Sequence, residues 1–166
     1  MAAVFALEEK IMFYNGYALI DGVFWAFLFY INCQNNRLRN TIATLAIIAL
    51  IIAVIIVIPK GIQVHFRHEL VCLNSLFQVL LVLLFFYEKY RGDVDGPLSG
   101  EPIFWFSMGL LLYAPTTYFL FVFYPQVTDR SDPQLAALWN MHHLLNASMY
   151  LIFSVGMYVN KWRTAH

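Results

Sequence analysis

A few polar and ionisable side chains interrupt long apolar stretches of this sequence. They are Asp21, Asn74, Gln78, His142, His143 and Asn146. A charged side chain in hydrocarbon is costly, roughly 2.5–3.5 kcal/mol for Asp on insertion scales, so such groups usually face a bundle interior and mark function. We expect these six residues to form a ligand pocket or a polar network inside a membrane.

Two interpretations of this set stay open. Amide side chains such as Asn74, Gln78 and Asn146 can join helices by hydrogen bonds worth about 0.6–2 kcal/mol each, and we favour that packing role for them. For Asp21 and the histidine pair, a packing role and a role in a ligand pocket or proton path are equally supported. Neutral amides would serve as packing groups more cheaply than ionisable ones do.

Histidines also raise the question of a metal or haem. A membrane haem usually takes two axial histidines from different helices, and His68 with His142 or His143 could supply them. Two histidines near helix ends are common, so we expect no cofactor and keep a haem- or quinone-binding subunit as the alternative. We see no Ser/His/Asp triad, glycine-rich phosphate loop or catalytic carboxylate pair, and therefore predict that the chain is not an enzyme.

The composition specifies the kind of fold that must position these residues. Of the 166 residues, 61% are apolar and only 12% are charged, and the mean hydropathy is +0.65. A water-soluble domain of this length could not bury so much apolar surface, and disordered chains are poor in apolar residues. The net charge of +0 gives no reason to expect a nucleic-acid partner.

Spanning the hydrocarbon as a helix takes about 20 mostly apolar residues, and water-free surroundings require the backbone to bond internally. We therefore predict an all-α polytopic membrane protein, a single transmembrane domain over residues 1–166. Its five spans are expected at about 11–33, 41–58, 69–87, 102–124 and 133–160. Small residues at Ala43, Ala46, Ala49 and Ala53 give the second span a stripe for close packing.

The basic residues suggest an orientation. Five spans place one group of basic residues on each side of the membrane. The first group is Arg37, Arg39, Lys89, Arg91, Lys161 and Arg163, and the second is Lys10, Lys60, Arg67 and Arg130. The larger group is expected to be cytoplasmic, which places the N-terminus outside and the C-terminus inside.

Three stretches resemble a group of poorly characterised bacterial multi-span membrane proteins, found free-standing or as the membrane module of sensor histidine kinases. They are YALIDGVFW in the first span, FWFSMGLLLY with a later FLF in the fourth, and WNMHHLLN in the fifth. The group tends to carry an acidic residue at the position of Asp21 and a Trp, His and Asn spaced as Trp139, His142 and Asn146. The resemblance implies a multi-pass protein of the bacterial inner membrane.

These observations lead to one functional expectation. We expect a non-catalytic membrane protein that acts as a subunit or ligand-sensing module of a larger assembly. Its partners would be membrane lipids and other membrane-protein subunits. The pocket is expected among the first, third and fifth spans, with Asp21 as its buried charge and His142 or His143 as its ligand-contacting group.

Overall fold

The structure, a computed structural model, describes residues 2–58, 67–92, 97–128 and 133–164, with side chains described for 12–58, 67–92, 97–123 and 140–159. The elements are α1 (Ala2–Asn32), α2 (Asn36–Val57), α3 (His68–Arg91), the short 3-10 helix η1 (Leu98–Gly100), α4 (Pro102–Thr128) and α5 (Pro133–Thr164). These ranges contain no strand, which confirms the predicted all-α class.

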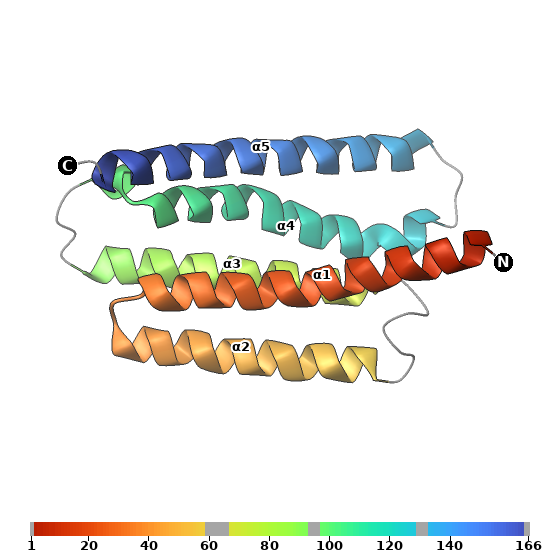
Figure 1. The fold of residues 1–166 in the computed structure, drawn as a ribbon, viewed down its shortest axis with the longest axis horizontal. Helices are drawn as coiled ribbons and strands as arrows, with labels where there is room; N and C mark the ends of the chain where they lie inside the picture. Colours follow the sequence, from red (N-terminus) through yellow and green to blue (C-terminus); the bar gives the residue numbers. More distant parts are fainter. Residues whose placement is uncertain (1, 59–66, 93–96, 129–132, 165–166) are drawn as a thin grey trace.

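The five long helices lie side by side along one axis (Figure 1). α3 contacts α1, α2 and α4, whereas α5 packs chiefly against α4. α3 is therefore the central helix, and polar side chains along it can reach neighbours on three sides.

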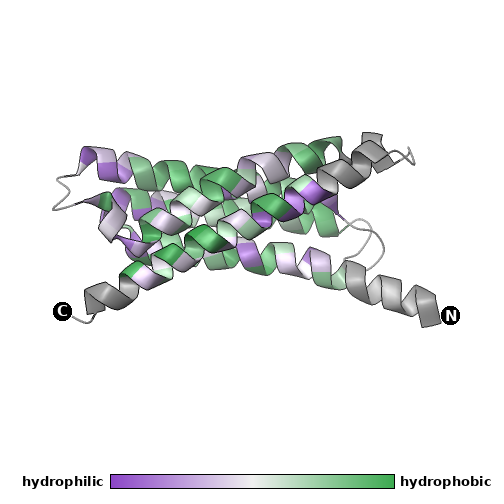
Figure 2. Cartoon of the chain, turned by 90° about the horizontal axis from the view of Figure 1, so that it is seen from above, coloured by the Kyte–Doolittle hydropathy of each residue, from purple (hydrophilic) through white to green (hydrophobic). Residues whose placement is uncertain are grey.

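Four of these helices are long and apolar enough to cross a membrane: the segments Met12–Asn32, Asn36–Val57, His68–Arg91 and Pro102–Phe123. They correspond to the first four predicted spans. In Figure 2, apolar residues, drawn in green, recur along the coloured parts of the helices. Within α5, Asn140, His142, His143 and Asn146 lower the hydropathy of the described part.

The second helix begins earlier than predicted, at Asn36 rather than at Thr41. Asn35 precedes the helix in extended conformation, and its side-chain oxygen accepts hydrogen bonds from the backbone N–H groups of Arg37 and Leu38 at 2.9 and 3.4 Å. This is the arrangement of a helix N-cap. Hydropathy marks the membrane-length segment, whereas the cap determines where the helix starts.

Glycines allow the helices to approach closely. A Cβ atom on Gly109 of α4 would lie 2.6 Å from the Phe153 ring of α5 and 3.3 Å from the Met149 carbonyl oxygen. A Cβ on Gly156 would lie 3.0 Å from the Cβ of Trp105. Since lipid tails are as apolar as leucine, helices in a bilayer associate mainly through close packing, and small residues permit it.

One end of the bundle carries most of the described charge. Glu88 near the end of α3 accepts hydrogen bonds from the backbone N–H groups of Gln34 and Asn35 at 2.8 and 2.7 Å, which fixes the α1–α2 turn. Lys89 pairs with Glu101, at 2.7 Å, and joins α3 to the start of α4.

The described basic side chains divide unequally between the two ends. Arg37, Arg39, Lys89 and Arg91 lie at the end that holds the α1–α2 turn, and Arg67 lies at the opposite end of α3. The arginines at the first end also cover aromatic rings, because the Arg39 guanidinium lies 4.7 Å from the Tyr30 ring centre and that of Arg91 lies 4.9 Å from Tyr87. The remaining predicted basic positions, Lys10, Lys60, Arg130, Lys161 and Arg163, lie outside the described side chains.

Candidate functional site

The Asp21 carboxylate is the centre of a polar network between α1 and α3. Its Oδ1 accepts a hydrogen bond from the Trp25 indole Nε1 at 3.0 Å. Its Oδ2 accepts from the amide nitrogens of Asn74 and Gln78, at 2.8 and 2.6 Å. The structure thus brings together three of the six predicted residues, in the network Asp21–Trp25–Asn74–Gln78.

Helical spacing explains why these side chains meet. Asp21 and Trp25 are four residues apart on α1, and Asn74 and Gln78 are four apart on α3, so each pair shares one helix face. Gln78 is 3% exposed and Trp25 is 6% exposed, while Asp21 is half-buried. Every donor in the network is a neutral N–H group, and Asp21 forms no ion pair with any residue that the structure describes.

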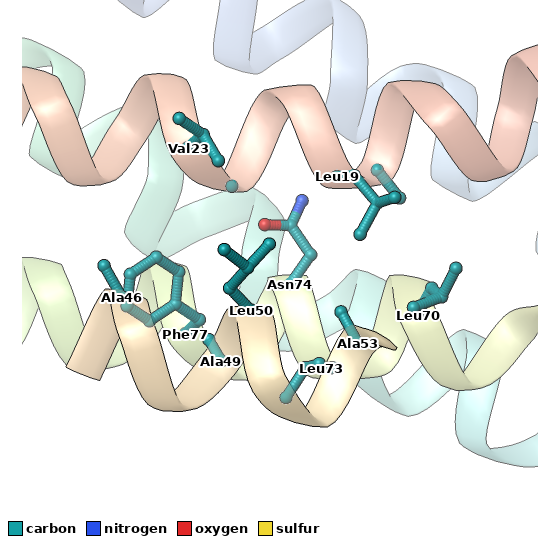
Figure 3. A pocket seen from close by; sticks show the side chains of 12 residues that line it. Leu19, Val23, Ala46, Ala49, Leu50, Ala53, Leu70, Leu73, Asn74 and Phe77 are labelled. Carbon is teal, nitrogen blue, oxygen red and sulfur yellow. The ribbon is translucent and has the colours of Figure 1, made fainter. Parts of the chain in front are cut away.

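Gly22 makes the contact between Asp21 and Asn74 possible. A Cβ atom at Gly22 would lie 2.8 Å from the Asn74 side-chain oxygen, closer than real Cβ contacts. That oxygen is buried and accepts no hydrogen bond within the described residues. Figure 3 shows the Asn74 side chain extending from α3 towards α1.

Beside Asn74 lies a cleft of about 50 Å³ among α1, α2 and α3 (Figure 3). Apart from Asn74 its walls are apolar, and they include the predicted small residues Ala46, Ala49 and Ala53. A water molecule occupies about 30 Å³ in the liquid, so the cleft has room for a small apolar group. This position differs from the pocket expected among the first, third and fifth spans, because α5 packs on α4 and α2 takes the place next to α1.

His142 lies in an aromatic cluster between α4 and α5. Its ring centre is 5.5 Å from Tyr113, 5.9 Å from Phe121 and 5.8 Å from His143. His142 is half-buried, whereas His143 is exposed. Asn146 is half-buried and shares no hydrogen bond with Asp21, Asn74 or Gln78 in the described part of the chain.

Tyrosines lie between the two groups. The Tyr17 side chain, one turn before Asp21, interacts electrostatically with Asp21, with Tyr113 of α4 and with Tyr150 of α5. Tyr113 in turn lies against His142. The predicted set is therefore divided into two clusters that tyrosine side chains connect.

The histidines predicted as weak haem ligands are spread over two helices. His68 begins α3, and its Nδ1 lies 3.6 Å from the Glu69 carboxylate. Within the described residues no group of three or more His, Cys, Asp or Glu side chains could hold a metal ion. The Trp139 side chain lies outside the described residues.

Several residues of the site were not among the predicted set. Trp25 stands four positions after Asp21 in YALIDGVFW, so helical spacing alone could have identified it. Tyr113 offered no such signal, because its contact with His142 joins two helices. Asn15 is 1% exposed, and its side-chain oxygen accepts a hydrogen bond from the Arg67 backbone N–H at 3.0 Å, which ties α1 to the start of α3.

Comparisons of the chain with known protein families, with curated proteins and with solved structures find no match.

Proposed function

We propose that this chain is a non-catalytic integral membrane protein that acts as a subunit or ligand-sensing module of a larger membrane assembly. The observation that carries the proposal is the Asp21 carboxylate, which is held by three neutral N–H donors between two apolar helices. Helix packing alone does not require an ionisable group there, because amides make the same interhelical bonds at lower cost.

Asn74 provides a route from ligand to signal. Its amide nitrogen donates to Asp21, and its oxygen lies at the wall of the cleft with no partner among the described residues. A ligand with a small apolar group and a hydrogen-bond donor would fill the cleft and bond this oxygen. Movement of Asn74 would then alter the contact between α1 and α3, a small shift at an interface of the kind that switches membrane proteins.

The membrane arrangement follows from the same features. We place α5, with 32 residues, as a fifth span beside α4. The end that holds Arg37, Arg39, Lys89 and Arg91 is assigned to the cytoplasm, which places the N-terminus outside in a bacterial inner membrane. The outward face of α2, where Ile47, Ile51 and Ile55 are exposed, would contact lipid or another subunit.

The experiment compares Asp21→Asn with Glu69→Gln in native membranes. Both changes turn a carboxylate into an amide, but Glu69 lies at the start of α3 outside the network. We expect Asp21→Asn to insert normally and to change the proteins or small molecules that co-purify, while Glu69→Gln behaves as wild type. Unchanged partners and ligands in Asp21→Asn would leave these side chains with a packing role only.

The aromatic cluster supports a second proposal, a redox or proton-handling subunit that binds a quinone or haem. His142 lies beside the flat rings of Tyr113 and Phe121, an environment suited to a planar ligand. A Soret band, or a quinone in the solvent extract that is lost in His142→Ala, would favour this function. A colourless, quinone-free preparation would exclude it.

A further inference from the structure

We infer that Arg67, at the start of α3, binds the phosphate of an anionic lipid headgroup. The residue is 8% exposed, and its guanidinium atoms Nε and Nη2 are buried with no hydrogen-bond partner among the described residues. A buried unpaired guanidinium is costly, since each N–H loses its water without gaining an acceptor. The missing partner is therefore an acceptor outside the described chain.

The two unpaired atoms specify the kind of acceptor. Nε–H and one Nη2–H point the same way and form one edge of the planar guanidinium. Such an edge binds two oxygens of a phosphate or carboxylate in parallel. The nearest acidic residue in sequence, Glu69, is directed to His68, with 3.6 Å between Oε2 and Nδ1.

The position of Arg67 at a helix N-terminus also favours the binding of an anion. It is the N-cap residue of α3, a helix of 24 residues, and its side chain makes no capping hydrogen bond. The N-terminus of a helix carries partial positive charge and attracts anions. The Asn15 oxygen bonds the Arg67 backbone N–H at 3.0 Å, so the backbone that carries the guanidinium is fixed to α1.

The membrane determines the source of the phosphate. α3 is one of the four helices long and apolar enough to cross a bilayer, and Arg67 directly precedes it. We therefore place the Arg67 side chain at the level of the headgroups, where its buried edge must turn outward to meet a lipid phosphate. A phospholipid phosphate is already present at that depth, whereas free phosphate would have to diffuse there from solution. This inference rests on the proposed membrane placement and is independent of the Asp21 network.

The test uses purified full-length protein in vesicles of phosphatidylcholine alone or mixed equally with phosphatidylglycerol. Native mass spectrometry then counts retained phosphatidylglycerol for wild type, Arg67→Gln and Arg67→Lys. Charge-assisted hydrogen bonds to a phosphate predict that Arg67→Gln binds about ten- to a hundredfold more weakly, with Arg67→Lys between it and wild type. Arg39→Gln, at the opposite end of the bundle, is the control and should bind as wild type.

A stability measurement covers the case in which Arg67→Gln folds poorly. Arg67→Met removes the charge and keeps apolar bulk, so it should be at least as stable as wild type in phosphatidylcholine alone. Added phosphatidylglycerol should raise the melting temperature of wild type and leave that of Arg67→Met unchanged.

Equal phosphatidylglycerol retention in Arg67→Gln and wild type would overturn the site. Inorganic phosphate is also added to the wild-type protein in detergent. If it raises the melting temperature as much as phosphatidylglycerol does in vesicles, the bound phosphate does not have to come from a lipid, and that part of the inference is overturned. Protein that fails to insert at all would instead contradict the membrane placement of the proposed function.

Discussion

Replacing Gly22 with alanine should loosen the contact between α1 and α3. The added Cβ would lie 2.8 Å from the Asn74 oxygen, where ordinary van der Waals contact begins at 3.4 Å. Asn74 must move, and its hydrogen bond of 2.8 Å to Asp21 is lost or distorted. Interhelical hydrogen bonds in membranes contribute about 0.6–1.7 kcal/mol, and overpacking costs about 1–3 kcal/mol. We therefore expect a loss of about 1–2 kcal/mol.

The matched control lies on the same helix. A Cβ at Gly16 would meet nothing within 4 Å, so Gly16→Ala should be neutral or slightly stabilising through helix propensity. Both variants can be compared by reversible unfolding in mixed micelles with increasing dodecyl sulfate. The chain has four tryptophans, so in a background that retains Trp25 alone the fluorescence reports the state of the network itself.

A double-mutant cycle isolates the cause. In an Asn74→Ala background the oxygen that collides with the new Cβ is gone, so Gly22→Ala should cost nothing further. Equal stability of Gly22→Ala and Gly16→Ala would refute the reasoning. So would an unchanged Gly22→Ala effect in the Asn74→Ala background.

Two further predictions concern other parts of the fold. Gly109→Ala should separate α4 from α5, because its Cβ would lie 2.6 Å from Phe153. We expect the free energy of unfolding to fall by about 1–3 kcal/mol in the same assay. Stability equal to wild type would contradict this packing. Burial, and then the Glu88 carboxylate, raise the pKa of the Cys33 thiol from 9.0 to about 11. Because the thiolate is the reactive form, the alkylation rate of Cys33 should increase about tenfold per pH unit until about pH 11. At about pH 8 the alkylation should be faster in Glu88→Gln than in wild type, because that variant lacks the carboxylate. A rate that stops rising near pH 9 would contradict that environment.

The helices and half of the site follow from sequence rules. Apolar runs of membrane length predict the helices because a backbone in hydrocarbon must bond to itself. The four-residue spacing of Asn74 and Gln78 places both amides on one face, and Asp21 is the group at similar depth that they could reach. The same spacing rule also accounts for Trp25.

The partners of each helix could not be derived in this way. Periodicity shows that His142 faces a neighbour, but it does not say whether that neighbour is α1 or α4. Which helix packs against α5 depends on close contacts such as those of Gly109 and Gly156. These contacts join α5 to α4 because the shapes of the two helix surfaces fit together. The cleft among α1, α2 and α3 follows from the same packing, and so its position was not predicted.

The central claim is tested most directly by purifying the wild-type protein from native membranes in mild detergent. Mass spectrometry then identifies everything that co-purifies, and a visible spectrum is recorded. We predict a colourless preparation with a stoichiometric protein partner or a small molecule bound in the Asn74 cleft. A protein that arrives alone, without any bound molecule, would contradict the proposed role. A Soret band in the spectrum would contradict it in favour of a redox subunit.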